Sequence, residues 1–290
     1  MKLVFWLSTH EPSGGAKVFL EHARRLAARG HETNVERGAS APSTSGKDAL
    51  VVTRYRDVEP ALDTGARVLH LIQGLDVPEG GFFRQLAKKR RVARAFAAPT
   101  RKICVSRHLV ERFPGSRLAP TGVDLATFAP GEPAPRRVLL SGRGPTKRID
   151  RAFRALEGIE GVEVVHLIPT ASLGEESVAA LVRSARVYLS TVSPEEGFDL
   201  VALEAMASGV ACVLSGGGAH QELAPDLVAG FEPEKLRRAV LRALDDPGER
   251  ERRVALGLDA ARRRSWETVM PEVEAAYLLS LRDEPREVAR

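Results

Sequence analysis

Two glutamates separated by seven residues, Glu196 and Glu204, lie in the segment of this chain whose residue types best suit chemistry. An apolar run, Val187–Ser190, precedes them and must end as a strand before Pro194, because proline cannot donate to a ladder. Leu200–Ser208 has helical propensity and an apolar face. The order predicts a strand, then a loop carrying Glu196, then a helix carrying Glu204.

The start of that helix suits a phosphate or a diphosphate. The first backbone N–H groups of a helix lack partners within it and carry positive dipole, so an anion can dock there at the carboxyl edge of a sheet. Glu204 would then be placed to accept hydrogen bonds from a ribose diol, and Glu196 would face whatever group the diphosphate carries. The residues expected to form this donor-binding turn are Gly197, Phe198, Asp199, Leu200 and Val201.

Residues 196–209, EGFDLVALEAMASG, resemble EGFGLVALEAMACG of the retaining GT-B glycosyltransferases of family 4, the glycosyl transferases group 1. In that family the first glutamate contacts the donor sugar and the second contacts the ribose, so the resemblance implies these roles for Glu196 and Glu204. Asp199 departs from the pattern, because glycine is usual at its position. We expect Asp199 either to cap the helix or to add a carboxylate near the donor.

Other segments carry the same resemblance. Gly14-Gly15-Ala16-Lys17-Val18 and the later LAARGHE resemble the family's first loop and helix, where glycines let backbone approach a diphosphate or acceptor; a plain strand-to-helix turn is the alternative. Residues 121–124, TGVD, with Phe128, resemble the interdomain element. The run GGGAHQE that includes Gly217 resembles a glycine-rich turn lining the donor pocket, and a tight turn without a ligand is its alternative.

The resemblance also implies two cations. Residues 141–148, SGRGPTKR, are similar to the family's GR…K element, whose cations neutralise the donor diphosphate as it leaves. Arg143 fits directly, and we assign the second cation to Lys147, with Arg148 as the alternative. A dinucleotide-binding reading of Gly142 and Gly144 is weak, because Lys147 stands at the third glycine position. His70 lies near where relatives place a histidine that contacts the donor sugar, although a histidine at a strand end is more often structural.

Length and alternation predict the fold that positions these residues. At 290 residues the chain exceeds one compact core, and short β-branched runs alternate twice with amphipathic stretches. The fold class is therefore α/β, and the resemblance implies GT-B, two Rossmann-like domains with parallel sheets facing across a cleft and a C-terminal helix packing back on the first domain. The domains expected are 1–128 on the acceptor side, 129–267 for the nucleotide sugar, and 268–290 as the returning helix and tail. The linker is expected within residues 121–135.

The elements expected are as follows. Strands are expected at Lys2–Leu7, Glu32–Glu36, Ala49–Thr53, Arg67–Leu71, Lys102–Val105, Arg137–Ser141, Val162–Ile168, Val187–Ser190, Val210–Leu214 and Leu227–Ala229. Helices are expected at Gly15–Arg29, Gly81–Ala97, Ser106–Phe113, Arg148–Leu156, Glu175–Ala185, Leu200–Ser208, Glu234–Leu244, Glu249–Arg264 and Thr268–Leu281.

Composition narrows the class of protein. With 43% hydrophobic and 28% charged residues and no apolar run near the ~20 residues that span a bilayer, the chain is typical of a globular protein. Cys104 and Cys212 each lie in a strand-like run of a different half, which favours reduced core thiols and a cytoplasmic location. No metal or other cofactor is expected, because Arg143, Lys147 and a helix N-terminus meet the diphosphate charge.

Part of the net charge of +5 is concentrated in residues 84–102. The basic residues there are Arg84, Lys88, Lys89, Arg90, Arg91, Arg94, Arg101 and Lys102. This stretch suits an anionic membrane surface, with peripheral contact at the inner face, and its alternative is a solvated helix face. Nucleic acid is not expected as a partner, because the stretch has only Phe96 among aromatics and matches no binding module.

These features predict an enzyme that moves a hexose-like sugar from a nucleoside diphosphate donor to an unidentified acceptor, with retention of the anomeric configuration implied by resemblance. Two alternatives stay open: a sugar-nucleotide 2-epimerase of the same architecture, and a non-catalytic GT-B subunit that binds a partner.

Overall fold

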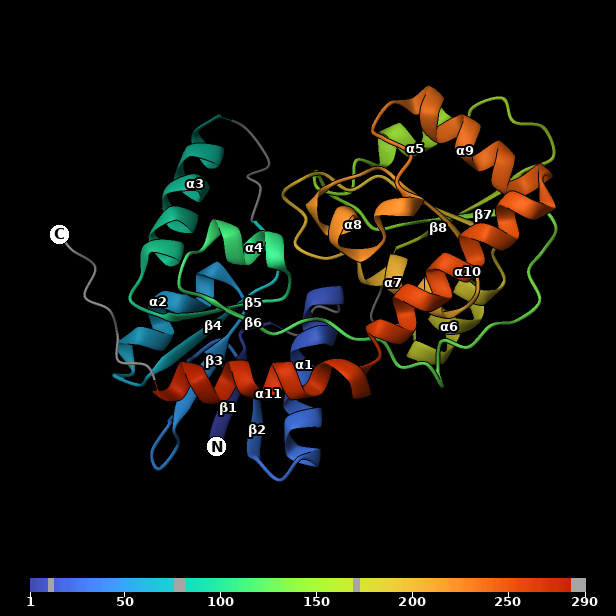
Figure 1. Ribbon diagram of the computed structural model, residues 1–290. Coiled ribbons are helices and arrows are strands. Elements are labelled where there is room, and N and C mark those ends of the chain that lie inside the picture. Colours follow the sequence, from blue (N-terminus) through green and yellow to red (C-terminus); the bar gives the residue numbers. More distant parts are fainter. Residues whose placement is uncertain (10–12, 76–81, 169–172, 283–290) are drawn as a thin grey trace. The chain divides into compact units, whose positions relative to one another are not determined.

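The computed structural model describes residues 1–9, 13–75, 82–168 and 173–282, and they form two compact units (Figure 1). Unit 1 comprises residues 1–120 together with the C-terminal segment from Met270, and unit 2 comprises residues 121–269. The sequence placed the divisions at residues 128 and 267. Residues 121–128 group with unit 2 because Val123 exchanges backbone hydrogen bonds with Arg264 and Trp266.

Unit 1 is built on a six-stranded sheet with the order β2-β1-β3-β4-β5-β6, in which every pairing is parallel. Its strands are β1 (Lys2–Leu7), β2 (Glu32–Arg37), β3 (Ala49–Val52), β4 (Val68–Ile72), β5 (Arg101–Cys104) and β6 (Arg117–Leu118). Its helices are α1 (Gly14–Ala28), α2 (Tyr55–Asp63), α3 (Phe82–Ala97), α4 (Arg107–Arg112) and most of α11 (Trp266–Arg282).

The two faces of this sheet are covered by different helices, because side chains alternate along each strand. Val4 and Trp6 of β1 share a core with Val58 of α2 and Ala95 of α3. Phe5, which points the other way, lies against Phe19 of α1 and Tyr277 of α11, with ring centroids 5.0 and 5.9 Å away. The α2–α3 layer therefore covers one face and the α1–α11 layer covers the other.

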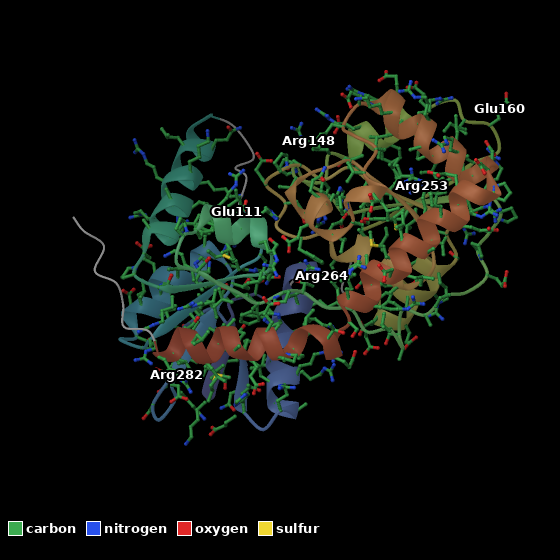
Figure 2. The ribbon with its side chains drawn as sticks, in the orientation of Figure 1. Glu111, Arg148, Glu160, Arg253, Arg264 and Arg282 are labelled. Carbon is green, nitrogen blue, oxygen red and sulfur yellow. The ribbon has the colours of Figure 1, made fainter. Side chains whose placement is uncertain are left out.

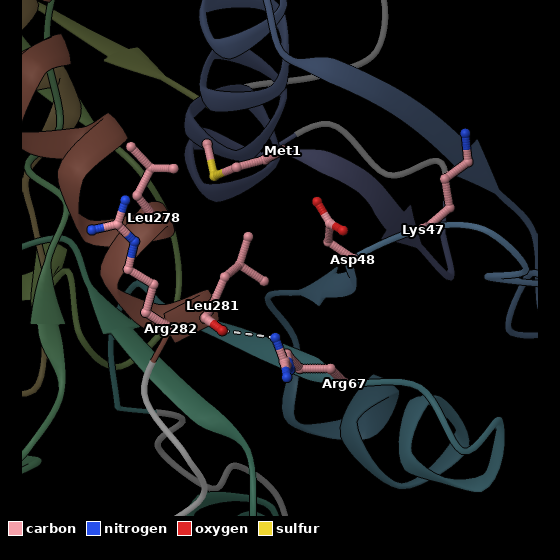
Figure 3. Close-up of a pocket in the computed structure, with 7 residues that line it drawn as sticks. All are labelled: Met1, Lys47, Asp48, Arg67, Leu278, Leu281 and Arg282. Carbon is pink, nitrogen blue, oxygen red and sulfur yellow. Dashed lines mark hydrogen bonds between the residues drawn. The ribbon is translucent and has the colours of Figure 1, made fainter.

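Helix α11 is fastened to unit 1 by polar contacts as well as packing. The Tyr277 hydroxyl lies 3.1 Å from Nδ1 of buried His22, and Glu274 accepts from Arg29 at 2.7 Å. At the end of the helix, Arg67 donates to the Leu281 carbonyl at 2.7 Å beside a hollow at the amino-terminal edge of the sheet (Figure 3). The prediction that the C-terminal helix packs on the first domain is confirmed.

Unit 2 has a four-stranded parallel sheet with the order β10-β9-β7-β8. Its strands are β7 (Arg137–Ser141), β8 (Glu163–Leu167), β9 (Val187–Ser190) and β10 (Ala211–Leu214). Its helices are α5 (Ile149–Leu156), α6 (Glu175–Arg183), α7 (Leu200–Ala207), α8 (Gly218–Leu223), α9 (Pro233–Asp245) and α10 (Pro247–Arg263), with a 3₁₀ turn at Pro225–Leu227.

One face of this sheet packs on α5 and α9 through a core that includes Leu140, Leu189 and Val213. On α10, buried Arg253 donates to the Cys212 carbonyl at 2.9 Å and to Glu249 of the same helix at 2.8 Å, so its guanidinium joins this helix to β10. Cys104 and Cys212 are both buried free thiols, as the sequence predicted. None of the described helices is long and apolar enough to cross a membrane.

The predicted elements are confirmed with shifts of one or two residues at most ends, the short strand β6 was not predicted, and three further differences stand out. Helix α2 was missed because Pro60 lies inside it and argues against a helix. Residues 227–229 do not form a strand, because Val228 makes only an isolated bridge to Leu214 after the 3₁₀ turn. The glycine run after β10 is followed directly by α8, where the sequence indicated only a turn.

The buried histidine of β4 gives unit 1 a pH dependence. His70 is 1% exposed, and burial, aided by the charge of Lys102, lowers its pKa to about 3. An unfolded histidine takes up its proton near pH 6.5, so the free energy of unfolding should fall as pH drops from 6.5 toward 3. At pH 5 this one group accounts for a loss of about 2 kcal/mol.

His70→Leu should remove that part of the loss, which urea unfolding at pH 7.5, 6 and 5 would measure. Buried His22 shifts in the same direction, so some dependence should persist in the variant. An identical pH dependence in the variant and the parent chain would contradict a neutral buried His70.

Candidate functional site

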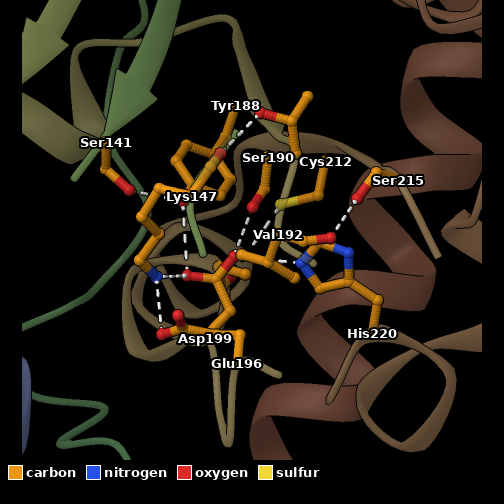
Figure 4. Close-up of polar contacts among 12 residues, drawn as sticks. Ser141, Lys147, Tyr188, Ser190, Val192, Glu196, Asp199, Cys212, Ser215 and His220 are labelled. Carbon is orange, nitrogen blue, oxygen red and sulfur yellow. Dashed lines mark hydrogen bonds and ion pairs between the residues drawn. The ribbon is translucent and has the colours of Figure 1, made fainter. Parts of the chain in front are cut away.

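Three loops meet at the carboxyl edge of the unit 2 sheet, because the ends of parallel strands share one edge (Figure 4). They are residues 142–148 after β7, residues 191–199 after β9 and residues 215–217 after β10. All of the functional residues that the sequence predicted for this half, except those within helix α7, lie on these loops. The architecture therefore brings them to one place.

Short hydrogen bonds hold the first two loops together. The Thr191 hydroxyl donates to the carbonyls of Lys147 and Arg148 at 2.9 and 3.0 Å, and the Ser193 N–H donates to the Thr146 carbonyl at 2.7 Å. These contacts join backbone to backbone or to a short side chain. These contacts alone fix the backbone of Lys147 relative to the 191–199 loop, without any contribution from a long side chain.

The third loop approaches so closely that it needs glycine. A Cβ on Gly217 would lie 2.9 Å from the Ser193 carbonyl oxygen, and Gly216 has a φ of +100°. The Ser215 hydroxyl donates to the Val192 carbonyl at 3.0 Å. Gly217 is also the residue before α8, so its expected place in a glycine-rich turn is observed, and its expected contact with a donor stays a prediction.

Lys147 is the cation at the centre of the site. Its Nζ lies 3.0 Å from Oε1 of Glu196 and 3.4 Å from Oδ1 of Asp199. Burial alone would lower the pKa of Lys147, but the carboxylates of Asp199 and Glu196 outweigh it and raise that pKa above its ordinary value. Lys147 is therefore charged throughout the physiological range.

Asp199 does not cap helix α7. It occupies the N-cap position, yet its side chain accepts no capping hydrogen bond and is fully buried beneath the loop. Its carboxylate accepts from the Ser190 hydroxyl and lies 3.0 Å from Nε2 of His220, and the Tyr188 hydroxyl lies 3.5 Å away. Of the two alternatives left by the sequence, the cap is wrong.

The charge of Asp199 is retained in spite of its burial. Burial raises the pKa of a carboxyl group, but Lys147 and the hydrogen bond from His220 outweigh that effect and hold the pKa of Asp199 well below its usual range. Burial and the Asp199 charge together raise the pKa of Tyr188, whose hydroxyl is also 2.6 Å from that of Ser141.

The contacts of His220 define its tautomer. The Gly216 N–H, which can only donate, points at Nδ1 from 3.3 Å, so Nδ1 is the acceptor. The ring proton then belongs on Nε2, where it is donated to Asp199. A neutral imidazole satisfies both contacts, and it connects the third loop to Asp199.

Two arginines lie on the first loop near Lys147. Arg143 and Arg148 are exposed, and neither makes an ion pair with another residue of the described ranges. Arg148 has left-handed backbone, with a φ of 44°, immediately before α5 (Figure 2). Lys147, rather than Arg148, is the cation in contact with Glu196, while both arginines are open to an anion from solvent.

The remaining residues of the donor-binding turn are mostly buried. Gly197 and Phe198 are buried, and the Arg264 guanidinium lies over the Phe198 ring, 5.3 Å from its centroid. Half-buried Leu200 and Val201 open helix α7. Glu204 lies in the second turn of that helix and is 3% exposed, so its proposed contact with a ribose stays a prediction.

Three predicted residues belong to unit 1. Gly14 and Gly15 begin α1, and Gln73 donates to the Gly15 carbonyl at 2.8 Å. His70 does not end its strand as predicted, because β4 continues to Ile72. It is buried and stacked on Phe96, which is the structural alternative raised from sequence.

The sequence did not single out four residues of this site. They are Ser141, Tyr188, Ser190 and His220. His220 could have been predicted from the sequence, because it follows a glycine run that comes after a strand, at the same sheet edge as the E-x7-E segment. Within the described parts of the chain, no group of three or more His, Cys, Asp and Glu side chains is arranged to hold a metal.

Part of the chain matches a known family of proteins. Residues 126–246 match the family model described as Glycosyl transferases group 1. The chain is 39% identical over 125 residues to the MMP alpha-(1->4)-mannosyltransferase of Mycolicibacterium hassiacum, a match covering 39% of this chain and 29% of that protein. It is 30% identical over 146 residues to the phosphatidyl-myo-inositol mannosyltransferase of Mycobacterium leprae, covering 49% and 37%. The matches thus span about a third of these relatives' length.

Solved structures match over nearly the whole chain. Sucrose-phosphate synthase from Thermosynechococcus elongatus superposes with a TM-score of 0.76 at 16% identity, covering 96% of this chain and 99% of that one. Anabaena Alr3699/HepE, in complex with UDP and glucose, superposes with a TM-score of 0.70 at 14% identity, covering 97% and 99%. These likenesses show the fold, which is GT-B.

The first loop offers a direct test of how Lys147 is held. Gly142 has a φ of +87°, and a Cβ there would lie 2.7 Å from Cγ of Lys147. Gly142→Ala should therefore combine left-handed strain with displacement of Lys147, and lower the free energy of unfolding by about 2–4 kcal/mol in urea titrations.

Gly158→Ala is the matched control. Gly158 has a φ of +67° but no atom within 4 Å of the added Cβ, so only the strain of about 1–2 kcal/mol should appear. Equal losses in the two variants would show that Gly142 does not set the position of Lys147.

Proposed function

We propose that this GT-B chain, whose residues 126–246 belong to the glycosyl transferases group 1, transfers a hexose from a nucleoside diphosphate sugar to an acceptor. The acceptor class, whether glycan, lipid or small molecule, is left open. The names of the matched relatives favour mannosyl transfer, and a superposed structure that contains UDP and glucose favours a nucleotide-sugar donor.

The observation that carries this proposal is the contact between Lys147 and Glu196 at the carboxyl edge of the unit 2 sheet, beside the start of α7. Such an edge is where parallel α/β sheets bind nucleotides, and the first N–H groups of a helix attract phosphate. A cation and a carboxylate 3.0 Å apart, each with a partly exposed side chain, suit a ligand with an anionic part and a hydroxyl-rich part.

The chemistry follows from charge. When the bond between the sugar and the diphosphate breaks, negative charge builds on the leaving group and positive charge builds on the sugar ring. Arg143, Lys147 and the helix start would stabilise the leaving group, and Glu196 would position the sugar. We further propose that transfer proceeds without a metal and with retention of the anomeric configuration, as the resemblance implies.

A sugar-nucleotide 2-epimerase and a non-catalytic binding subunit are the competing functions. An epimerase would convert the donor without any added acceptor, whereas a binding subunit would bind the donor and turn over nothing. Neither is favoured by a particular contact in the site.

Glu196→Gln tests the proposed role directly. A panel of UDP- and GDP-linked glucose and mannose should include one donor that raises the melting temperature of the parent chain by mass action. With that donor, the rate of sugar transfer by the variant should be lower by about 10²–10³-fold. Without an acceptor, the rate of donor hydrolysis should fall by the same factor.

Glu160→Gln, at an exposed position of unit 2, should leave turnover unchanged. Each variant needs its own melting curve, so that a loss of activity is not a loss of fold. If no donor of the panel stabilises the chain, or if Glu196→Gln retains full turnover, the proposal is wrong.

We also propose that unit 1 contacts an anionic membrane surface through α3. Lys89, Arg90, Arg91 and Arg94 are exposed along this helix. Between α2 and α3 lies a cavity of about 100 Å³. Its lining includes apolar side chains, such as Val58 and Ala95, and also arginines. Lys102 does not share this face, because it lies in β5 and donates to the Ala98 carbonyl.

The membrane contact should be electrostatic. Sedimentation with vesicles rich in anionic lipid should be strong at low salt and fall sharply above about 0.15 M. Replacing Arg90, Arg91 and Arg94 with glutamine should abolish it, while the same change at Arg237, Arg238 and Arg262 of unit 2 should not. Equal loss in the two triple variants would show that α3 is not the binding face.

A further inference from the structure

Asp199 is the residue of the site whose presence the resemblance does not account for. Glycine is usual at its position, and a glycine could form the turn before α7. Instead a carboxylate lies fully buried under the loop, next to the cation that we assign to the donor diphosphate (Figure 4). Burying a charge is costly even with four polar neighbours, so the buried Asp199 carboxylate calls for a functional reason.

The two carboxylates around Lys147 differ in how firmly they are held. Glu196 and Lys147 each have 17% of the side chain exposed, so their contact faces the solvent side of the site. Asp199 has no exposed surface and is held from below by Ser190, His220 and Tyr188. A ligand from solvent can replace Glu196 as a partner of Lys147, but it cannot reach Asp199.

His220 makes the lower contact still firmer. Its Nδ1 is occupied by the Gly216 N–H and its Nε2 by Asp199, so the ring cannot turn without losing both hydrogen bonds. The third loop is in turn packed through Gly217 against the Ser193 carbonyl. Asp199 is therefore fixed by all three loops of the site.

We propose that Asp199 is a positioning residue that tethers Lys147 from below while Lys147 exchanges Glu196 for the diphosphate of the donor. This inference rests on the proposed function. The exchange ends the contact of Glu196 with Lys147, so that Glu196 can contact the sugar, and it keeps the Lys147 ammonium in one place as the diphosphate leaves.

The tether has an electrostatic consequence. Lys147, Glu196 and Asp199 together carry a net charge of −1 when Glu196 is ionised, so an arriving diphosphate meets a buried like charge within a few ångströms. Asp199 thus weakens binding of the diphosphate in the ground state and favours its release. In exchange, Lys147 is held where charge develops in the transition state.

Asp199→Asn separates these two effects, because asparagine keeps the shape and removes the charge. We expect the variant to bind a nucleoside diphosphate about three- to tenfold more tightly and to have a kcat lowered by about tenfold or more. Titration calorimetry with UDP and GDP measures the first change, and steady-state kinetics with the donor found by thermal shift measures the second. A merely structural role would weaken binding and lower kcat together.

Two further variants sharpen the test. Asp259→Asn removes an equal charge from an exposed position of α10 and should change neither quantity. In a Lys147→Met background, Asp199→Asn should cause no further fall in kcat, because Lys147 is the group through which Asp199 acts. If Asp199→Asn fails to fold, Asp199→Gly should give the same tighter binding and lower kcat.

Each outcome separates the inference from the function on which it rests. If the parent chain binds no nucleoside diphosphate, the proposed function fails. If the parent chain binds and turns over, but Asp199→Asn binds the diphosphate more weakly or keeps its kcat, the tether is wrong and the function stands. Equal falls in kcat with and without Lys147 would also overturn the tether.

Discussion

A fully buried carboxylate next to a partly exposed ammonium is the constraint on which the unit 2 site depends. Loss of hydration favours the neutral form of both Asp199 and Lys147, and each offsets this effect for the other. Together they keep their charges, and the neutral His220 and the hydroxyl of Ser190 satisfy the remaining carboxylate lone pairs. The three loops are arranged around this pair.

The fold itself was readable from hydrophobic alternation. Runs such as Arg137–Ser141 and Val187–Ser190 are buried on both faces, so they read as continuous apolar strands and were placed to the residue. Parallel order then brings their carboxyl ends to one edge, which predicts that Lys147 and Glu196 come together. Helix α2 was not readable, because Pro60 is tolerated there and the tertiary contacts of Val58 outweigh its cost.

The site was only partly predictable, because side-chain direction depends on tertiary contacts. The sequence located Asp199 in the right turn but could not show that its carboxylate is buried beneath the loop. A capping carboxylate and a buried one can start from the same N-cap backbone position. The sequence singled out His70 and not His220, although both lie close to the end of a predicted strand, and only hydrogen-bond partners show that His220 belongs to the site. Lys147 and Arg148 are neighbours, and the left-handed φ of Arg148 decides which one enters the site.

The network around Asp199 is better explained by function than by stability. Replacing a buried ion pair with apolar groups of similar volume is often neutral or stabilising, so selection for stability alone would not require these charges. A hydrogen-bonded pair does fix geometry, because moving either partner leaves the other buried and uncompensated. Such rigidity matters where a cation must stay in one place to stabilise a leaving group. Small displacements of a catalytic group can change a reaction rate strongly. In the proposed exchange, Glu196, which shares Lys147 but lies on the solvent side, is the partner that Lys147 gives up for the diphosphate.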